Sequence, residues 1–190
     1  MKKMSGLLLS VLWIGGVTFF MASLATIHGV SFFPDKNVAP SQATAGRWTL
    51  THVIGEGCKC SRQVYLYLLK RGPLSDADEN VVILGKMPQE AQELQAHGFK
   101  VSFREARSLA SEKAIGVPFL LITSDKGEAV YAGGYASSEI RESTAIQDLS
   151  ILASLHDGKV AKEFPIFGCA VSQHIQSLID PMKFKYKESL

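Results

Sequence analysis

The chain has only three cysteines among its 190 residues, Cys58, Cys60 and Cys169. Three cysteines are too few for a scaffold held together by disulfides, so the fold must rest on an apolar core. An odd number also leaves at least one cysteine unpaired within the monomer, or shared with a ligand or partner. The length allows one domain and an appendage.

A strong charge of either sign is absent as well. The formal net charge is +2, and Lys2 and Lys3 account for it, so nothing indicates a nucleic-acid partner. The common catalytic motifs are missing too: the chain has no phosphate-binding glycine loop, no Gly-x-Ser-x-Gly and no His-Glu-x-x-His. Two charged clusters remain, and both are interpreted as solvated surface: the tail lysines Lys183, Lys185 and Lys187, and the acidic stretch from Asp76 to Glu79.

Charged residues are missing between Lys3 and Asp35. Within that span, Leu7 to Ile27 is mostly apolar and long enough for a bilayer-spanning helix, which needs roughly 20 apolar residues. We therefore predict a single-pass transmembrane signal-anchor over residues 1–30, with the lysine pair in the cytoplasm. In a bacterium this places the domain on the inner membrane, facing the periplasm, where disulfides persist. The alternative is a cleaved signal peptide, with Ser23-Leu24-Ala25 as its cleavage site.

A linker over residues 31–46, rich in Ala, Ser, Pro and Gly, leads into a folded domain over residues 47–158. The first expected elements are a strand over Trp48–Ile54, a helix over Arg62–Arg71 ended by Gly72-Pro73, and a strand over Val81–Leu84. They are followed by a helix from Pro88 to Gly98 and a short strand over Phe99–Phe103. The last are a hairpin of Phe119–Thr123 and Glu128–Tyr131 and a long helix from Ser137 or Ser138 to His156. A parallel β-α-β start joined to an antiparallel hairpin predicts a small mixed α/β sheet with helices on both faces.

Two cysteines lie one residue apart in the turn Gly57-Cys58-Lys59-Cys60-Ser61, between the first strand and the first helix. At the start of a helix, the unpaired N–H groups and the helix dipole favour negative charge. A thiol in this position ionises more readily, and the thiolate is the reactive form. We therefore predict an exposed, easily ionised sulfur at this turn, which serves redox chemistry or metal handling.

Residues 48–156 resemble the thioredoxin fold in two motifs. A cysteine-bearing turn opens the first helix, and Gly116-Val117-Pro118-Phe119 resembles the loop in which that family carries a cis-proline. The resemblance implies that Pro118 lies beside the reactive thiol, where the backbone of the loop can pair with an incoming peptide. It also implies that Cys58 is the nucleophile and that Ser61 stands where the resolving cysteine usually lies.

This alignment depends on His52, because the family carries an ionisable buried group six residues before the nucleophile and His52 precedes Cys58 by six. As a proton acceptor, His52 would suit a thiol that titrates near neutrality. Two alternatives stay open. In one, Cys60 aligns with the resolving cysteine and the first cysteine is missing; in the other, His52 is a half-buried strand histidine with a backbone partner.

The C-terminal extension, residues 159–190, carries the third cysteine in Phe167-Gly168-Cys169. A short amphipathic helix is predicted after it, with Cys169 at its start and on its polar face. The apolar markers of this helix are Val171, Ile175, Leu178 and Ile179. A Cys-x-Cys-Ser turn together with a late Phe-Gly-Cys segment resembles membrane-anchored thioredoxin-like proteins of the RedB type. That resemblance implies one site formed by Cys58, Cys60 and Cys169; the alternative is that Cys169 is a small buried apolar residue.

Three functions are compatible with these residues. The first is thiol–disulfide exchange with a cysteine-containing protein or a membrane redox partner, in which Cys58 attacks a disulfide and Cys60 or Cys169 resolves the mixed disulfide. The second is binding of copper or zinc by the three thiolates, with His174 or His52 as a fourth ligand. The third is a non-enzymatic accessory subunit of a membrane complex. The first, which needs no cofactor, is our working hypothesis, and its catalytic residues are Cys58, Cys60, Cys169, Pro118 and His52.

Overall fold

The computed structural model describes residues 2–28, 31–32, 46–105, 116–183 and 185–186. The chain divides into two compact units, Met1–Val30 and Ser31–Leu190. Most of the predicted linker lies outside the described residues, as do Ala114, Ile115 and Lys187.

The first unit consists of a single described helix, α1 (Lys2–His28). Over the residues that the structure describes, no helix meets the length and apolarity needed to cross a membrane. The transmembrane anchor, and the periplasmic location that depends on it, therefore stay predictions from the sequence.

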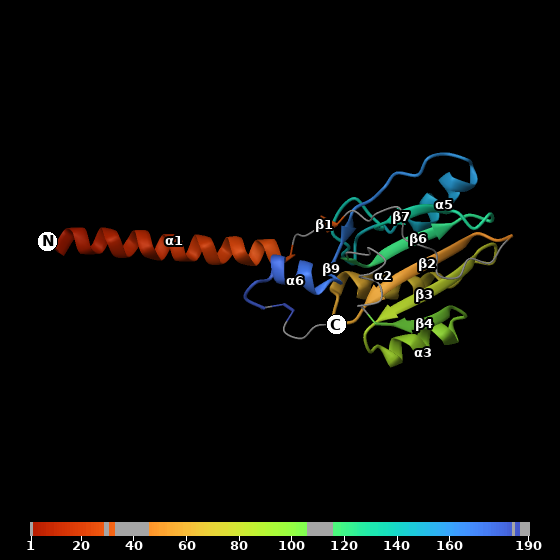
Figure 1. Ribbon diagram of the computed structural model, residues 1–190, viewed down its shortest axis with the longest axis horizontal. Coiled ribbons are helices and arrows are strands. Elements are labelled where there is room, and N and C mark those ends of the chain that lie inside the picture. Colours follow the sequence, from red (N-terminus) through yellow and green to blue (C-terminus); the bar gives the residue numbers. More distant parts are fainter. Residues whose placement is uncertain (1, 29–30, 33–45, 106–115, 184, 187–190) are drawn as a thin grey trace. The chain divides into compact units, whose positions relative to one another are not determined.

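The second unit is built on a five-stranded sheet with the strand order β4-β3-β2-β6-β7 (Figure 1). Its strands are β2 (Thr49–Gly55), β3 (Asp78–Leu84), β4 (Lys100–Arg104), β6 (Phe119–Thr123) and β7 (Ala129–Gly133). β2, β3 and β4 run parallel, whereas β6 pairs antiparallel with both β2 and β7. The predicted mixed sheet, with its parallel start and its antiparallel hairpin, is therefore confirmed.

Strand β2 lies at the centre of the sheet and carries the cysteine turn at its end. Leu50 and Ile54 are fully buried, and Val53, which points to the opposite face, is 4% exposed. Burial on both faces is typical of a central parallel strand. The strand ends at Gly55, at the edge where the parallel strands have their carboxyl ends, and this is the edge at which open α/β sheets place their sites.

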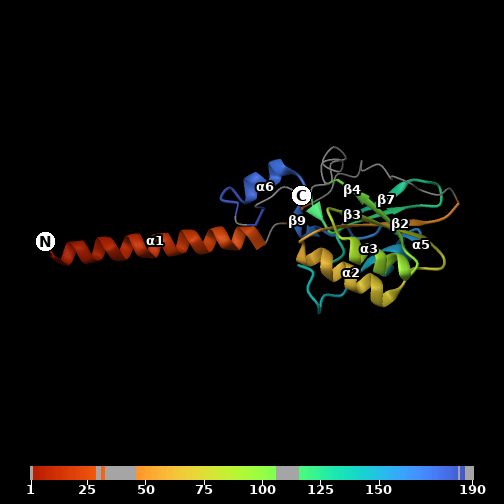
Figure 2. The same ribbon diagram turned by 90° about the horizontal axis from the view of Figure 1, so that it is seen from below.

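Three helices pack on the sheet: α2 (Lys59–Arg71), α3 (Pro88–Ala96) and α5 (Asp148–His156). They lie on the same face (Figure 2), as right-handed β-α-β connections that step in one direction require for α2 and α3. The predicted flanking helices are therefore present, and the three named here cover one face of the sheet. α2 begins before the predicted Arg62 and ends at Gly72, whose φ of 75° suits a glycine.

The long helix predicted from Ser137 or Ser138 to His156 is wrong in its first half, because α5 begins only at Asp148. Residues 137–147 form irregular turns. Their path is fixed by a long-range contact, in which the N–H of Gln147 donates to the carbonyl of Tyr135. Asp148, the first residue of α5, is fully buried, and its carboxylate accepts from the hydroxyl of Tyr67 at 2.7 Å and from Arg71 at 3.3 Å.

The C-terminal extension folds against the end of the sheet at which β2 runs into α2 (Figures 1 and 2). It forms strands β8 (Ile166–Phe167) and β9 (Cys169–Ala170) and helix α6 (Gln173–Ile179). β8 pairs with β1 (Ser31–Phe32), and β9 pairs antiparallel with β5 (Gly116–Val117).

Two predictions about this extension are wrong. Cys169 lies in strand β9 and not on the tail helix, because the strand ends before Ser172 caps α6. The apolar face of α6 also differs from the prediction. Leu178 is 66% exposed, whereas Gln176 is buried because its amide donates to the carbonyl of Ala170.

Candidate active site

Cys58 occupies the N-cap of α2, directly after strand β2 and its turn. Its backbone is extended, with φ −89° and ψ 115°, and its carbonyl accepts the helical hydrogen bond from the N–H of Arg62 at 3.0 Å. Cys58 itself provides no side-chain hydrogen bond to the helix end. The thiol therefore lies at the positive end of the helix dipole, as the turn between strand and helix predicts.

A cis peptide bond joins Val117 and Pro118, in the loop that leads into β6. This loop lies beside Cys58, whose Sγ is 3.4 Å from the carbonyl oxygen of Val117. Gly55 permits the approach, because a Cβ there would lie 2.8 Å from Cγ2 of Val117. Cysteine at the helix start and cis-proline at the antiparallel strand thus meet on one mixed sheet. The fold is thioredoxin-like.

Cys169 reaches the same place from the C-terminal extension. In the pairing of β5 with β9, Cys169 lies directly opposite Val117, the residue whose carbonyl faces Cys58. The two thiols are close enough that each shifts the pKa of the other. The thioredoxin-like domain and the extension therefore contribute one cysteine each to a common cluster beside the cis-proline.

The three cysteines differ in their acidity. The hydrogen bond from Cys169, aided by one from Ser61, outweighs burial and lowers the pKa of Cys58 from 9.0 to about 6. The same bond raises the pKa of Cys169, because Cys169 is the donor and burial adds to the effect. Burial, with repulsion from Cys58, raises the pKa of Cys60 to about 11. Near neutral pH, Cys58 is therefore the thiol of the cluster that ionises most readily.

Removing the donor on Cys169 should raise the pKa of Cys58. We expect the thiolate absorbance of Cys58 to appear with a midpoint near pH 6 in the wild type, and to vanish below it as the sulfur is protonated. In Cys169→Ala the midpoint should move up towards the ordinary value of about 8.5. Cys169→Ser is the matched control, because its hydroxyl can still donate and should keep the midpoint low. Equal midpoints in the alanine and serine variants would contradict the assignment.

The cysteines are buried, so the predicted exposure of the turn is wrong. Cys58 is 3% exposed, Cys60 7% and Cys169 6%, and all three are thiols. Strand β9 contributes to this burial, because its pairing with β5 brings Cys169 against Cys58. A strand of two residues has no periodicity, so the sequence pattern could not place it.

His52 is fully buried in β2, and both of its ring nitrogens have partners other than a cysteine. Nδ1 lies 2.9 Å from the hydroxyl of Tyr135, and Nε2 lies 3.0 Å from Oε1 of Glu79. The geometry therefore gives no support to His52 as proton acceptor for Cys58. Nor is it a half-buried histidine with a backbone partner. It links Glu79 to Tyr135, whose hydroxyl lies 3.3 Å from the carbonyl of Phe119, the residue after the cis-proline.

Glu79 lies in β3 and is 5% exposed, so the interpretation of residues 76–79 as a solvated loop is wrong at its end. The strand begins at Asp78 and turns the side chain of Glu79 into the core. There its carboxylate accepts from Arg71 at 2.6 Å and from the N–H of Leu74 at 2.6 Å. Burial opposes ionisation, but hydrogen bonds from His52 and Arg71 outweigh it and lower the pKa of Glu79 to about 2.

Two residues near the cluster gain a role that the sequence did not reveal. The Oγ of Ser61 accepts from the N–H of Gly55 at 3.0 Å, and a hydrogen bond from Ser61 also lowers the pKa of Cys58. Lys185, interpreted as part of a solvated tail, is only partly exposed, and its charge favours ionisation of Cys60 and Cys169. The place of Ser61 in the cysteine turn could have predicted its role near Cys58. No residue pattern around Lys185 predicts that its charge acts on the cysteines.

Among the residues that the structure describes, no group of three or more His, Cys, Asp or Glu side chains is arranged to hold a metal ion. His174 is exposed on α6, and His52 is engaged with Tyr135 and Glu79. Copper or zinc binding stays a prediction, and metal analysis of the purified protein tests it.

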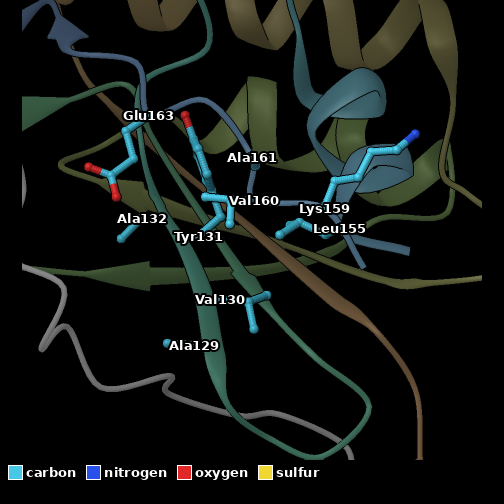
Figure 3. A pocket seen from close by; sticks show the side chains of 9 residues that line it. All are labelled: Ala129, Val130, Tyr131, Ala132, Leu155, Lys159, Val160, Ala161 and Glu163. Atoms are coloured by element: carbon cyan, nitrogen blue, oxygen red, sulfur yellow. The ribbon is translucent and has the colours of Figure 1, made fainter. Parts of the chain in front are cut away.

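A pocket of about 260 Å³ lies elsewhere, between β7 and the segment after α5 (Figure 3). Tyr131, Leu155 and Val160 contribute to its wall, and none of its lining residues is a cysteine or a histidine. The cysteine cluster, and not this pocket, is therefore the candidate active site.

No protein-family model matches the chain, and no curated protein does. Solved structures do match. An uncharacterized conserved protein from Geobacillus kaustophilus is 15% identical, with 76% of this chain and 89% of that one covered and a TM-score of 0.52. A hypothetical protein from Sinorhizobium meliloti is 16% identical, with 76% and 91% covered and a TM-score of 0.51. Both matches bear on the fold alone.

A third match is the thioredoxin domain of a thiol-disulfide oxidoreductase from Bacteroides vulgatus. It is 13% identical, and the match covers 55% of this chain and 82% of that one. Its TM-score of 0.37 is too low to support any conclusion about this chain.

Proposed function

We propose that this protein is a thiol–disulfide oxidoreductase in which Cys58 is the nucleophile and Cys169 the resolving cysteine, acting on a cysteine-containing protein. The observation that carries the proposal is the meeting of the two cysteines beside the cis-proline loop, where the carbonyl of Val117 lies 3.4 Å from Sγ of Cys58 and Val117 pairs with Cys169. A nucleophile at a helix start and a second thiol within contact distance are the two groups that disulfide exchange requires.

The reaction has two exchange steps. The Cys58 thiolate attacks one sulfur of the substrate disulfide, forms a mixed disulfide and releases the other substrate sulfur as a thiolate. Cys169 then attacks the sulfur of Cys58, forms the Cys58–Cys169 disulfide and releases the second substrate thiolate, which takes the proton of Cys169. The substrate disulfide gains two electrons and the two protein thiols lose them; the reverse sequence oxidises a substrate dithiol.

The acidity of Cys169 fits the second step. Its pKa is raised chiefly because it donates to the Cys58 sulfur, and burial adds to this. When Cys58 is held in a mixed disulfide, that sulfur carries no negative charge, so the main obstacle to ionisation of Cys169 is removed. Lys185 then favours the Cys169 thiolate through its charge. The resolving thiol is thus protonated while Cys58 attacks, and it ionises more easily once the mixed disulfide has formed.

Cys60 is a poorer candidate for either role. It belongs to the first turn of α2, where side chains two residues apart do not face each other. Its pKa of about 11 keeps it protonated at neutral pH. Cys60 is therefore assigned no exchange step.

Disulfide mapping tests the assignment. We expect protein oxidised by a slight excess of glutathione disulfide and digested under acid conditions to contain Cys58 linked to Cys169, with Cys60 as a thiol. A Cys58–Cys60 bridge would overturn the role of Cys169, and three unreacted thiols would favour a structural role for the cluster. Metal analysis of the same sample tests the copper or zinc alternative.

A further inference from the structure

Strand β9 covers the cysteine that the proposed function requires to react. Cys58 is 3% exposed, and Cys169, in β9, is the thiol in contact with it. Attack on a disulfide requires the sulfur of Cys58 to bond directly to an incoming sulfur. With β9 in place, the position beside Cys58 is already held by a cysteine of the chain itself.

The pairing that holds β9 is short and depends on one glycine. Among the residues that the structure describes, two pairs join β9 to β5, and Val117 faces Cys169 in one of them. A side chain on Gly168, the residue before Cys169, would collide with the carbonyl oxygen of Val117 and lie 2.9 Å from Cδ of Pro118. Glycine is therefore needed at this position for β9 to approach the cis-proline loop.

The segments on both sides of β9 have anchors that do not depend on β9. Ile166 is fully buried, and the N–H of Gly134 donates to the carbonyl of Phe164 at 2.8 Å. After α6, the carboxylate of Asp180 accepts from the backbone N–H groups of Lys185 and Tyr186. A strand tethered in this way can leave and return without unfolding the domain, and its tether gives Cys169 a high effective concentration at Cys58.

We propose that β9 is an internal stand-in for the substrate: it occupies the edge of β5 beside Cys58, must leave before a substrate disulfide can enter, and returns to deliver Cys169 to the mixed disulfide. This inference rests on the proposed function. Ala170 and Val171 are buried, so the closed arrangement is the dominant one and reactivity is set by the fraction of molecules that open.

The contact at Gly168 also defines the substrate class. An extended segment that takes the place of β9 in the same register meets the same carbonyl of Val117 and the same ring of Pro118. The residue before its cysteine must then be glycine. The preferred substrate is therefore an extended peptide segment with a Gly-Cys pair, the cysteine lying opposite Val117 as Cys169 does.

The opening of β9 can be measured on full-length protein in which Cys58 is the only thiol, through Cys60→Ser and Cys169→Ser. The probe is dithiobis(nitrobenzoate), a small disulfide that releases a coloured thiolate. At about pH 9.5, where Cys58 is ionised with or without a donor at position 169, adding Gly168→Ala should expel β9 from β5 and raise the reaction rate of Cys58 by about tenfold or more. Tyr186→Phe, which removes the hydroxyl that accepts from the N–H of Ala170, should raise it less.

The control is Tyr65→Phe, which removes a tyrosine hydroxyl that is bonded to Glu93 and not to β9, and should leave the rate unchanged. Circular dichroism and thermal unfolding show whether each variant is folded. If Gly168→Ala does not fold, Tyr186→Phe still decides the question. Rates in the folded β9 variants no higher than in their parent would overturn the inference.

Two peptides test the substrate class on the same parent protein. They are Ile-Phe-Gly-Cys-Ala-Val and its counterpart with alanine in place of glycine, each carrying nitrothiobenzoate on its cysteine. The glycine peptide should react with Cys58 faster by about tenfold, and equal rates would overturn the glycine requirement.

The inference fails and the proposed function stands if the wild type reduces protein disulfides, the β9 variants react no faster than their parent, and the two peptides react at equal rates. If the β9 variants expose Cys58 but the wild type has no exchange activity, the proposed function fails.

Discussion

Replacing Cys58 by serine should abolish thiol–disulfide exchange. In an insulin-reduction assay with a dithiol as electron donor, we expect Cys58→Ser to lose activity by at least about a thousandfold, because the attacking thiolate is gone and a serine hydroxyl does not ionise near neutral pH. The lowered pKa of Cys58 makes it the sulfur in the cluster that is ionised under these conditions. Cys60 cannot substitute, since its pKa is raised to about 11, and in this variant Cys169 has lost Cys58, the thiol with which it exchanges.

Cys60→Ser is the matched control for this experiment. It makes the same chemical change two residues away, in the same helical turn, and should keep activity close to that of the wild type. Cys169→Ser should form the mixed disulfide but resolve it slowly, so that a substrate adduct on Cys58 accumulates and can be identified by mass spectrometry. Equal activity in the wild type and in Cys58→Ser would reject the proposed function.

The sequence predicted the sheet and one half of the site because these depend on local patterns. The apolar runs predict strands β3 and β6, and the residues after Asp125 predict a turn, without reference to other parts of the chain. The cysteine turn follows a strand and opens a helix, which places Cys58 at the N-cap. The Val117-Pro118 motif predicted the cis-proline beside it, and the structure has that bond and that contact.

The other half of the site depends on long-range pairing that leaves no local pattern. Cys169 meets Cys58 because β9, two residues long, pairs with β5, more than fifty residues earlier in the chain. Local spacing instead favoured a helix position for Cys169, since Gly168 directly precedes it and the helix at Gln173 follows closely. The prediction that the sulfur of Cys58 is exposed was wrong for the same reason, because the sequence pattern could not place β9 beside it.

Charged residues were misjudged for a related reason. Residues 76–79 have the composition of a solvated loop, and only the partners of Glu79 explain its burial. Arg71 comes from the end of α2 and His52 from the neighbouring strand, where it lies opposite Val81. A buried carboxylate is stable only when such partners are in place, and a sequence of one chain does not reveal them.

Removing the carboxylate of Glu79 should cost more stability than loss of any exposed ion pair. Glu79→Ala leaves the guanidinium of Arg71 and the ring of His52 without their main buried acceptor. Breaking one side of a buried ion pair typically costs about 3–5 kcal/mol. Because Arg71 keeps Asp148 as a second partner at 3.3 Å, we expect about 3 kcal/mol and a fall in Tm of roughly 10 °C, measured by thermal unfolding.

The pH dependence of the Tm difference between the wild type and Glu79→Ala shows whether the lost stability is electrostatic. The pKa of Glu79 is about 2 in the folded protein and about 4.5 in an ordinary carboxyl, so the folded state favours the ionised form. Its contribution is therefore complete above pH about 4.5 and is lost as the pH falls towards 2. The Tm difference between the wild type and Glu79→Ala should narrow over that range. Lys159→Ala, which breaks the exposed pair with Asp157, should cost less than about 1 kcal/mol. A Tm difference for Glu79→Ala that does not change with pH would instead indicate that lost packing, and not lost charge, destabilises the protein.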